Sequence, residues 1–418
     1  MLPVAGLALL VAGCTTAPQA DFAAIPTAGA PAFAGGRRVV PAATEEDLSA
    51  LLAEELARTG VPALAAGVLR GEQRVASGVA GVRRAGIGVP VTRGDRFAIA
   101  SAAKPISATT VARLVDLGIL GWDRPVRDYF PEVSAAPGWE KITLRHLLTH
   151  TAGLRDPWGS FLATTYLQRG TAAQRRAQLV AAVMRRAPST PPGTRVHYCN
   201  ADYIVAGAVA ERATGEIWEA LVHRHVFAPL GMASAGFGPP GTPGTLDQPW
   251  GHGAPRLAQL PLVGTLGFDP GSRGADYPAL ASPAGYVHLD LEDWAEFIAL
   301  HLRGHPANPQ RSPRLLTPTA FDVLQESLAP GTSGGWFVAE RAWARGKRPG
   351  DRGRVLFHLG DNGRWTSAVW LAPEIDFAVF AVCNVGNRDP AIDRVIATLV
   401  GRYAKAAASA GTSSPLAP

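Results

Sequence analysis

The chain has 418 residues, of which 47% are hydrophobic and 18% charged, so it can bury a large core as one big domain or two subdomains. Its 46 Gly and 35 Pro residues indicate a globular fold rich in loops rather than a disordered chain. The net charge of +6 comes with no Lys/Arg block interleaved with aromatic residues, which argues against a nucleic-acid-binding protein.

The first 13 residues are apolar and end in small residues before Cys14. A run this short cannot span a bilayer and indicates a signal peptide over 1–13. Small residues directly before a cysteine resemble a bacterial lipoprotein signal, in which Cys14 is acylated after cleavage. Residues 14–43, rich in Ala, Pro, Thr and Gly, are predicted to form a flexible tether. We therefore expect an exported protein that faces the periplasm and is anchored to the membrane by lipid alone; the alternatives are an ordinary signal peptide or a disordered terminus.

Hydrophobic periodicity and turn residues predict the elements that follow. In chain order we expect a helix from Thr44 to Gly60, strands over 63–69 and 73–82, a helix from Ser101 to about Leu120, helical patterns to about residue 300 with a Gly/Pro-rich loop over 237–276, strands over 336–343, 355–359, 366–371 and 377–384, a helix over 392–403, and a disordered tail at 406–418. Strands at both ends with helices between them predict one α/β domain over 44–405. Its sheet part covers about 44–115 and 330–405, and its inserted all-helical part covers about 116–329.

A candidate nucleophile, Ser101, lies where an apolar run turns into a helical pattern. Lys104 follows three residues later, so both side chains leave one face about one turn apart, within reach of a hydrogen bond. The chain has only four lysines among its 40 Lys and Arg residues, and an amine, unlike a guanidinium, can lose its proton when it is desolvated. The alternative is a helix-capping serine followed by an exposed lysine.

Two further segments carry polar side chains at turns. In an extended piece after a Pro-rich turn, Tyr198 and Asn200 face one way and Cys199 the other. A phenol beside a cation ionises more easily and can relay a proton, and an amide can orient a substrate. At the end of an apolar strand, His358 and Gly360 share a face, where glycine lets a ligand approach the backbone. The alternatives are a core tyrosine with a helix-capping asparagine, and a plain strand end at a hairpin.

Three other patterns are interpreted as structural. His146 and His150 lie four residues apart on one helical face, but the glutamate of an H-E-x-x-H site is missing, so we expect packed, hydrogen-bonded histidines and no metal site. Residues 331–335 fit G-x-S-x-G, yet a helix precedes and a strand follows, the reverse of a nucleophile elbow, which favours a glycine-rich turn. Cys199 and Cys383 make no disulfide framework, and their pairing stays open.

Taken together, the three segments resemble, in the same order, the motifs S-x-x-K, Y-x-N and [KH]-x-G of the serine β-lactamase and penicillin-binding-protein superfamily, specifically its class C-like branch. The resemblance covers about residues 45–405, and spacer segments at 142–154, 229–232 and 282–286 share in it. It implies a β-lactamase/transpeptidase-like α/β fold, in which an antiparallel sheet is flanked by helices, an all-helical subdomain is inserted, and the active site lies between the two.

By this resemblance Ser101 attacks a carbonyl and forms an acyl-enzyme, with Lys104 and Tyr198 sharing the role of proton acceptor. The oxyanion rests on the backbone N–H groups of Ser101 and Asp361. The residues implied to position the substrate are Asn200, His358 and Gly360. No metal or organic cofactor is implied.

Two residues depart from the family's pattern. The third motif carries His358 rather than Lys, which occurs in peptidase and esterase members and weakens the interpretation as a β-lactamase. Asp361 stands where small residues are usual. Because a carboxylate that faced the oxyanion would disfavour its charge, we expect this side chain to point away.

The sequence therefore predicts an exported serine hydrolase that acts on an ester or amide, with D-amino-acid peptides and β-lactams among the candidate substrates. Its expected partner is a small-molecule ester, amide or peptide, and no nucleic acid or obligatory protein partner is predicted. The alternative is a non-catalytic protein that binds peptidoglycan peptides or a partner on the same fold, if Asp361 disables the oxyanion site. A metallohydrolase is a remote third class, which chelation would test.

Overall fold

The computed structural model describes residues 36–156, 170–253, 265–325, 327–387 and 389–410. Cys14, the predicted signal peptide and most of the predicted tether lie outside the described residues. No helix in these described ranges has both the length and the apolar character that crossing a membrane requires.

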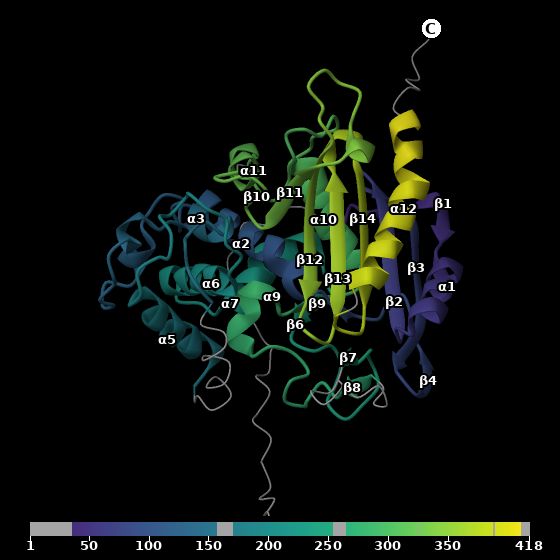
Figure 1. Ribbon diagram of the computed structural model, residues 1–418, viewed down its shortest axis with the longest axis horizontal. Helices are drawn as coiled ribbons and strands as arrows, with labels where there is room; N and C mark the ends of the chain where they lie inside the picture. The colour runs from purple at the N-terminus through teal and green to yellow at the C-terminus, as the bar shows by residue number, and fades with distance from the viewer. Residues whose placement is uncertain (1–35, 157–169, 254–264, 326, 388, 411–418) are drawn as a thin grey trace, which may run out of the picture. The chain divides into compact units, whose positions relative to one another are not determined.

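The largest element is a nine-stranded sheet with the order β1-β3-β2-β14-β13-β12-β11-β10, and β4 pairs with β3 outside this path (Figure 1). Its strands are β1 (Val40–Asp47), β2 (Ala63–Arg70), β3 (Gln73–Arg84), β4 (Ile87–Pro90), β10 (Thr332–Ser333), β11 (Trp336–Glu340), β12 (Arg354–Asp361), β13 (Thr366–Ala372) and β14 (Phe377–Cys383). The pairs are antiparallel except for β1 and β3, which are parallel, so the sheet is mixed rather than wholly antiparallel. The pairing of β2 with β14 confirms that strands from both ends of the domain build one sheet.

Helices cover both faces of this sheet. On one face lie α1 (Ser49–Thr59) and α12 (Asp389–Ala410) (Figure 1). Apolar side chains of both helices form a core with the strands. On the other face lies α10 (Leu291–Gly304), where the ring of Trp294 meets that of Phe380 at a centroid distance of 5.2 Å. Burial of apolar surface on both faces holds these layers together.

The helical part surrounds α2 (Lys104–Asp116), whose first eleven residues are all buried. The other helices of this part are α3 (Leu144–Leu148), α5 (Ala172–Met184), α6 (Asn200–Thr214), α7 (Trp218–Val222), α8 (Ala228–Leu230), α9 (Ser282–Gly285) and α11 (Pro318–Gln325). Short strands are also present: β5 (Phe97–Ala98), β9 (Val287–Leu289) and β6 (Gly236–Phe237) form one small sheet, and β7 (Gly251–Gly253) and β8 (Leu266–Phe268) form another. The inserted part is therefore not all-helical, and the loop predicted over 237–276 contains β7 and β8 where it is described.

The structure corrects the predicted start of the first helix. Thr44 does not cap a helix but lies in β1, because Glu45 bonds across to Arg74 of β3 at 2.7 Å and so pairs the segment with the sheet. The helix begins at Ser49, whose N–H donates to the carboxylate of Asp47 at 3.0 Å. Glu45, Glu46 and Asp47, which would form the first turn of a helix that started at Thr44, thus end β1 and precede the helix.

The stretch before β1 is also bound to the domain. The N–H of Val39 donates to Glu296 of α10 at 2.8 Å, and Arg37 forms an ion pair with Asp293 of the same helix. Residues 37–43 are therefore attached to the domain rather than part of a flexible tether. At the other end α12 continues to Ala410, past the predicted limit near residue 405, because its alanine-rich last turns favour helix.

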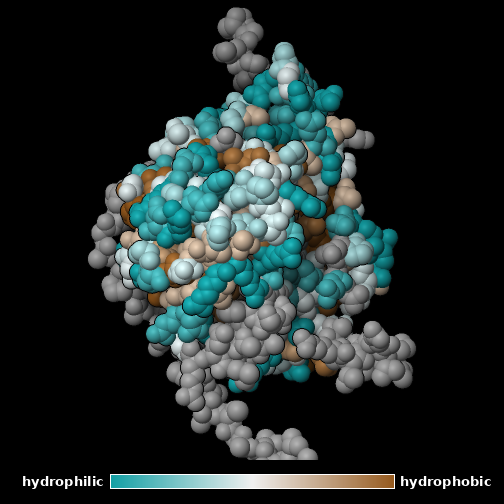
Figure 2. Space-filling view, turned by 60° about the vertical axis from the view of Figure 1, so that its left-hand side comes forward, coloured by the Kyte–Doolittle hydropathy of each residue, from teal (hydrophilic) through white to brown (hydrophobic). Residues whose placement is uncertain are grey.

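Apolar side chains are mostly gathered inside. They fill two buried cores, one on each face of the large sheet, and the larger core is shared with the helical part. On the face shown in Figure 2, hydrophilic and neutral residues dominate, and apolar residues form separate small areas. This distribution is that of a domain folded around its own interior.

Candidate active site

Ser101 lies in a short 3-10 helix (Ala100–Ala103) between β5 and α2, at the predicted turn from strand to helix. Its side chain does not cap this helix; instead its Oγ accepts hydrogen bonds from Lys104 Nζ at 3.1 Å and from Tyr198 Oη at 2.8 Å. The backbone bends sharply just before it, since Ala100 has a φ of 48°, in the left-handed region that residues with a Cβ seldom adopt. Strained positions of this kind cluster at functional sites.

The turn that carries Ser101 is fixed from both parts of the domain. The N–H of Ile99 donates to the carbonyl of Val287 in β9 at 3.0 Å, and the carbonyl of Ile99 accepts from Ser367 Oγ of β13 at 2.7 Å. Gly285 of α9 approaches so closely that a Cβ added there would lie 2.9 Å from the carbonyl oxygen of Ala100. The strained turn therefore has no room to relax on either side.

Lys104 is fully buried. Its Nζ donates to Asn200 Oδ1 at 2.9 Å and to the carbonyl of Ala284 at 2.6 Å, in addition to the contact with Ser101. Burial lowers the pKa of Lys104 from 10.5 to about 7, and it outweighs the opposite effect of nearby negative charge such as that of Asp156. Near neutral pH much of this amine is therefore unprotonated and able to accept a proton.

Tyr198 places its hydroxyl on Ser101, and its ring centroid lies 4.8 Å from Lys104 Nζ. The easier ionisation expected for a phenol beside a cation is not found. Loss of hydration around the hydroxyl raises the pKa of Tyr198 above its usual 10, although the residue as a whole stays 37% exposed. In the resting site the phenol is thus a hydrogen-bond donor.

Asn200 is the first residue of α6, and Cys199 occupies the N-cap position. The N–H of Asn200 donates to the carboxylate of Asp156 at 3.0 Å, and its side chain turns to Lys104. Cys199 is fully buried, with its Sγ 3.2 Å from Asp156. Tyr198 and Asn200 therefore both reach the Ser101–Lys104 pair while Cys199 does not, as the extended alternation predicted.

The third motif lies in β12. His358 is buried, and its ring centroid is 6.3 Å from that of Tyr198. Its Nδ1 lies 2.7 Å from the carbonyl oxygen of Leu359, so Nδ1 carries the proton and Nε2 is left as an acceptor. Burial lowers the pKa of His358 to about 3, and the positive charge at Lys104 acts in the same direction. The imidazole is therefore neutral near pH 7.

Gly360 was predicted to let a ligand approach the backbone, but the structure shows another reason for a glycine here. A Cβ added at Gly360 would lie 2.2 Å from the carbonyl oxygen of Ile99 and 2.4 Å from Ser367 Oγ. Glycine thus makes room for the turn that carries Ser101, and not for a ligand. The same close contact brings the end of β12, with the backbone of Asp361, next to that turn.

The side chain of Asp361 is held in the turn after β12. One carboxylate oxygen accepts from the N–H of Gly363 at 2.6 Å. The other accepts from Thr366 Oγ1 at 2.9 Å and from the N–H of Asn387 at 2.6 Å. These three donors lie in the turn after β12, at the start of β13 and after β14, so both carboxylate oxygens are occupied by groups outside the three motifs.

Three acidic or imidazole side chains lie against the motifs without having been predicted to do so. His150 is a packed histidine, as interpreted, with Nδ1 2.9 Å from Asp202 Oδ2, but its ring also meets that of Tyr198 at 4.6 Å. Asp156 accepts from the start of α6 and influences Lys104. The only sequence signal for His150 was its place in the family-like spacer over 142–154, and none marked Asp156 or Asp202.

The other sequence patterns behave as structural features. His146 Nδ1 accepts the N–H of Thr143 at 3.1 Å in a capping box. Residues 331–335 contain β10 and the two glycines that connect it to β11. Cys199 and Cys383 are both buried and free, so they are not paired. Among the residues that the structure describes, no group of three or more His, Cys, Asp or Glu side chains could hold a metal ion.

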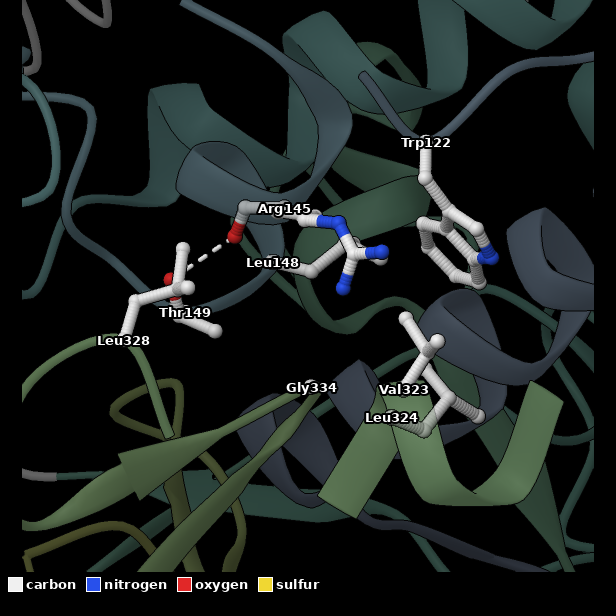
Figure 3. A pocket seen from close by; sticks show the side chains of 8 residues that line it. All are labelled: Trp122, Arg145, Leu148, Thr149, Val323, Leu324, Leu328 and Gly334. Carbon is white, nitrogen blue, oxygen red and sulfur yellow. Dashed lines mark hydrogen bonds between the residues drawn. The ribbon is translucent and has the colours of Figure 1, made fainter. Parts of the chain in front are cut away.

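A separate small hollow lies between α3, α11 and β10 (Figure 3). It is lined mainly by apolar side chains: Trp122, Arg145, Leu148, Thr149, Val323, Leu324, Leu328 and Gly334. None of these residues belongs to the three motifs. The carbonyl of Leu148 accepts from Tyr203 Oη at 2.8 Å and from the N–H of Gly335 at 3.2 Å, so the wall of the hollow is tied to the packing behind the active site.

Comparison with known proteins places this geometry in a family. Residues 48–401 match the family model described as Beta-lactamase. Penicillin-binding protein 4 of Amycolatopsis lactamdurans is 30% identical over 270 residues, which cover 64% of this chain and 65% of that protein. Esterase EstB of Burkholderia gladioli is 38% identical over 159 residues, or 36% of this chain and 40% of that protein. The chain thus spans less than two thirds of the length of each of these curated relatives.

Solved structures agree on the fold. The D-amino acid amidase from Ochrobactrum anthropi SV3, complexed with L-phenylalanine amide, superimposes with a TM-score of 0.64 over 88% of this chain and 98% of that chain, at 21% identity. This confirms the β-lactamase/transpeptidase-like fold that the motifs implied. With the family model matched over most of its length, the chain belongs to the Beta-lactamase family.

Proposed function

We propose that this chain is a serine hydrolase that cleaves an ester or amide bond through an acyl-enzyme on Ser101. The observation that carries the proposal is the pair of contacts on Ser101 Oγ, from the amine of Lys104 and the hydroxyl of Tyr198, in a site where burial lets the amine lose its proton near neutral pH. The relatives named as an esterase and a penicillin-binding protein, and the amidase of the same fold, support this class of reaction.

In the acylation step Ser101 Oγ bonds to the carbonyl carbon while its proton moves to the unprotonated Nζ of Lys104. The leaving group departs with the proton of the Tyr198 hydroxyl, and Lys104 returns its proton to Tyr198. Because burial raises the pKa of Tyr198, the phenol passes this proton on without persisting as a phenolate. Water then attacks the acyl carbon, its proton passes to Ser101 Oγ, and the acid leaves.

The negative charge on the carbonyl oxygen is assigned to the backbone N–H groups of Ser101 and Asp361. The contact of Gly360 with the Ser101 turn supports this assignment, because it brings the strand end to the nucleophile. The carboxylate of Asp361 is occupied by donors from its own turn, from β13 and from the segment after β14, and so does not oppose the charge. This favours an enzyme over the non-catalytic binding protein, which depended on a disabled oxyanion site.

Within this class, an uncharged ester or amide is favoured over a β-lactam, which carries a carboxylate. A substrate carboxylate is held best by a charged donor, and the buried His358 is neutral at pH 7 because its pKa is lowered to about 3. The imidazole offers a hydrogen bond to the substrate but no positive charge. Binding of an uncharged ester or amide therefore suffers least from the missing positive charge at His358.

Intact-mass measurement tests the proposal directly. Purified full-length chain is incubated with p-nitrophenyl esters, D-Ala-D-Ala peptides and penicillins. We expect at least one compound to add the mass of its acyl group and to give a burst of product, and Ser101→Ala to abolish both. The matched control, Ser49→Ala, removes a hydroxyl from the start of α1 and should leave both unchanged. A folded wild-type chain that is never acylated would contradict the proposal and favour a binding protein.

The rate of acylation should fall in acid as Lys104 takes up a proton. Because burial lowers the pKa of Lys104 to about 7, the fraction of unprotonated amine falls about tenfold for each pH unit below that value. We expect kcat/KM for an uncharged ester to rise with pH along a single acidic limb and to level off above about pH 7 to 8. A pH–rate profile that stays flat from about pH 5 to 9 would show that Lys104 is not the proton acceptor.

We also propose that the chain is exported and anchored through an acylated Cys14. The short apolar run that ends in small residues before this cysteine supports the proposal. Expressed at full length in a bacterium, the wild-type chain should fractionate with membranes and carry diacylglycerol on Cys14, whereas Cys14→Ala should not. A membrane fraction that holds both chains equally, with Cys14 unmodified, contradicts this.

A further inference from the structure

His150 adopts a backbone conformation that its own side chain does not favour. Its φ of 56° lies in the left-handed region, where glycine and asparagine are common and other residues carry a conformational cost. It follows α3, and its imidazole is buried, with 3% of the residue exposed. A turn that needed only this backbone shape would be served by glycine, so the imidazole itself has a use here.

The backbone of His150 makes a hydrogen bond before Tyr198, and its imidazole makes contacts at and after Tyr198. The N–H of His197 donates to the carbonyl oxygen of His150 at 2.8 Å, and the N–H of Cys199 lies 3.3 Å from His150 Nδ1. The ring of His150 also packs on the ring of Tyr198, with centroids 4.6 Å apart and planes tilted by 44°. His150 therefore holds the backbone before and after Tyr198 as well as its ring. This fixes the phenol whose hydroxyl reaches Ser101.

Asp202, in the first turn of α6, holds the imidazole from the other side. Its Oδ2 lies 2.9 Å from His150 Nδ1, and only 1% of the residue is exposed. Because Nδ1 faces the Cys199 N–H as well, Nδ1 acts as an acceptor, and the proton between the two side chains belongs to the carboxyl group of Asp202.

Burial agrees with this assignment of the proton. It raises the pKa of Asp202 well above 3.8 and lowers that of His150, so both groups favour their uncharged forms. An ionised Asp202 would instead stabilise the protonated form of Lys104, since a negative charge there raises the pKa of that amine. The ionisable groups that interact with the pair or pack against it are Lys104 of α2, Asp156, His197, Tyr198 and Cys199 before α6, Tyr203 of α6 and His358 of β12.

We propose that His150 and Asp202 are positioning residues of this site: as an uncharged, hydrogen-bonded pair they hold Tyr198 against Ser101 and keep negative charge away from Lys104. The inference rests on the proposed hydrolase function, and it adds two residues that act through Tyr198 rather than on the substrate.

Two substitutions of His150 separate positioning from folding, since both suit a left-handed backbone. His150→Asn keeps an acceptor near the place of Nδ1, whereas His150→Gly removes the ring contact with Tyr198 and the acceptor for the Cys199 N–H, and leaves only the backbone bond to His197. With the best ester of the acylation panel, we expect His150→Gly to lower kcat about 10²-fold with little change in KM, and His150→Asn to retain most of the activity. Both variants should remain folded, as thermal unfolding will show. A folded His150→Gly with wild-type kcat would overturn the inference.

Substitution of Asp202 tests the charge of the pair. In Asp202→Asn an N–H donor replaces the carboxyl O–H, so kcat and the acidic limb of the pH–rate profile should stay as in the wild type, while Asp202→Leu lowers kcat. A shift of that limb to lower pH in Asp202→Asn would show that Asp202 is ionised and overturn the uncharged pair.

Nitrogen NMR of labelled histidine gives a readout that does not depend on activity. An Nδ1 of His150 that stays unprotonated from about pH 5 to 9 supports the pair, and a protonated Nδ1 refutes it. If the wild-type chain is never acylated, the proposed hydrolase function is wrong. The NMR measurement would still show whether His150 Nδ1 carries a proton.

Discussion

Replacing Lys104 by methionine should lower kcat/KM about 10³-fold, because the site loses its proton acceptor while an unbranched side chain of similar length still fills the space. Lys104 is fully buried and touches Ser101 Oγ directly, so no exposed amine can take its place from solution in the same geometry. Stopped-flow measurement of acylation by an activated ester gives the rate. Tyr198 should not compensate, since burial raises the pKa of its phenol.

The same substitution should change how stability depends on pH. The pKa of Lys104 is about 7 in the folded chain and 10.5 as its ordinary value, so between these pH values the unfolded chain binds a proton that the folded chain does not. The stability of the wild type therefore rises with pH across this window, by up to about 1.4 kcal/mol per pH unit from this group. Lys104→Met lacks this contribution. The free energy of unfolding of the variant minus that of the wild type should fall between about pH 7 and 10.

The matched control is Lys141→Met, which removes an exposed amine of the helical part. We expect it to leave both acylation and the pH dependence of unfolding unchanged, because an exposed amine stays hydrated in both the folded and the unfolded chain. If Lys104→Met acylates as fast as Lys141→Met, the base is another group. If the stability difference does not change with pH, the amine is protonated in the folded chain.

Local sequence patterns predict the relative directions of the motif residues and the positions of most strands that carry them. Ser101 and Lys104 are one helical turn apart, and Tyr198 and Asn200 are two residues apart, so their relative directions follow from backbone periodicity alone. Six strands of the large sheet lie within three residues of their predicted ends for the same reason, because alternation and turn residues are local signals, whereas β1, β4 and β10 were not predicted. Family resemblance supplied the rest, by implying that the three segments meet.

The features of the site that could not be predicted from the sequence depend on contacts between distant segments. Gly360 was expected to admit a ligand, but the space beside it is occupied by the carbonyl of Ile99, far away along the chain. The raised pKa of Tyr198 follows from packing that no motif records. The start of the first helix predicted at Thr44 was wrong because Glu45 bonds to Arg74 of β3, and local propensity cannot show such a partner.

Gly360→Ala should be the most disruptive change of a single methyl group in the site. Its new Cβ would meet a backbone carbonyl at 2.2 Å and Ser367 Oγ at 2.4 Å, and neither can swing aside as the end of a long side chain would. β12 must therefore shift away from the turn that carries Ser101. We expect the free energy of unfolding to fall by about 1–3 kcal/mol and kcat/KM to fall about 10²-fold, measured by denaturant unfolding and ester hydrolysis.

Gly401→Ala is the matched control, since nothing lies within 4 Å of the added Cβ in this exposed position of α12. It should raise stability by about 1 kcal/mol through helix propensity and leave activity unchanged. Adding Ser367→Ala to Gly360→Ala removes the closest side-chain obstacle but leaves the Ile99 carbonyl in place, so we expect part of the stability to return without the activity. Because the displaced strand carries the N–H of Asp361, the loss should fall on kcat rather than on KM. Wild-type kcat in folded Gly360→Ala would mean that the end of β12 does not have to abut Ser101 for the reaction, and the assignment of Asp361 to the oxyanion would then be wrong.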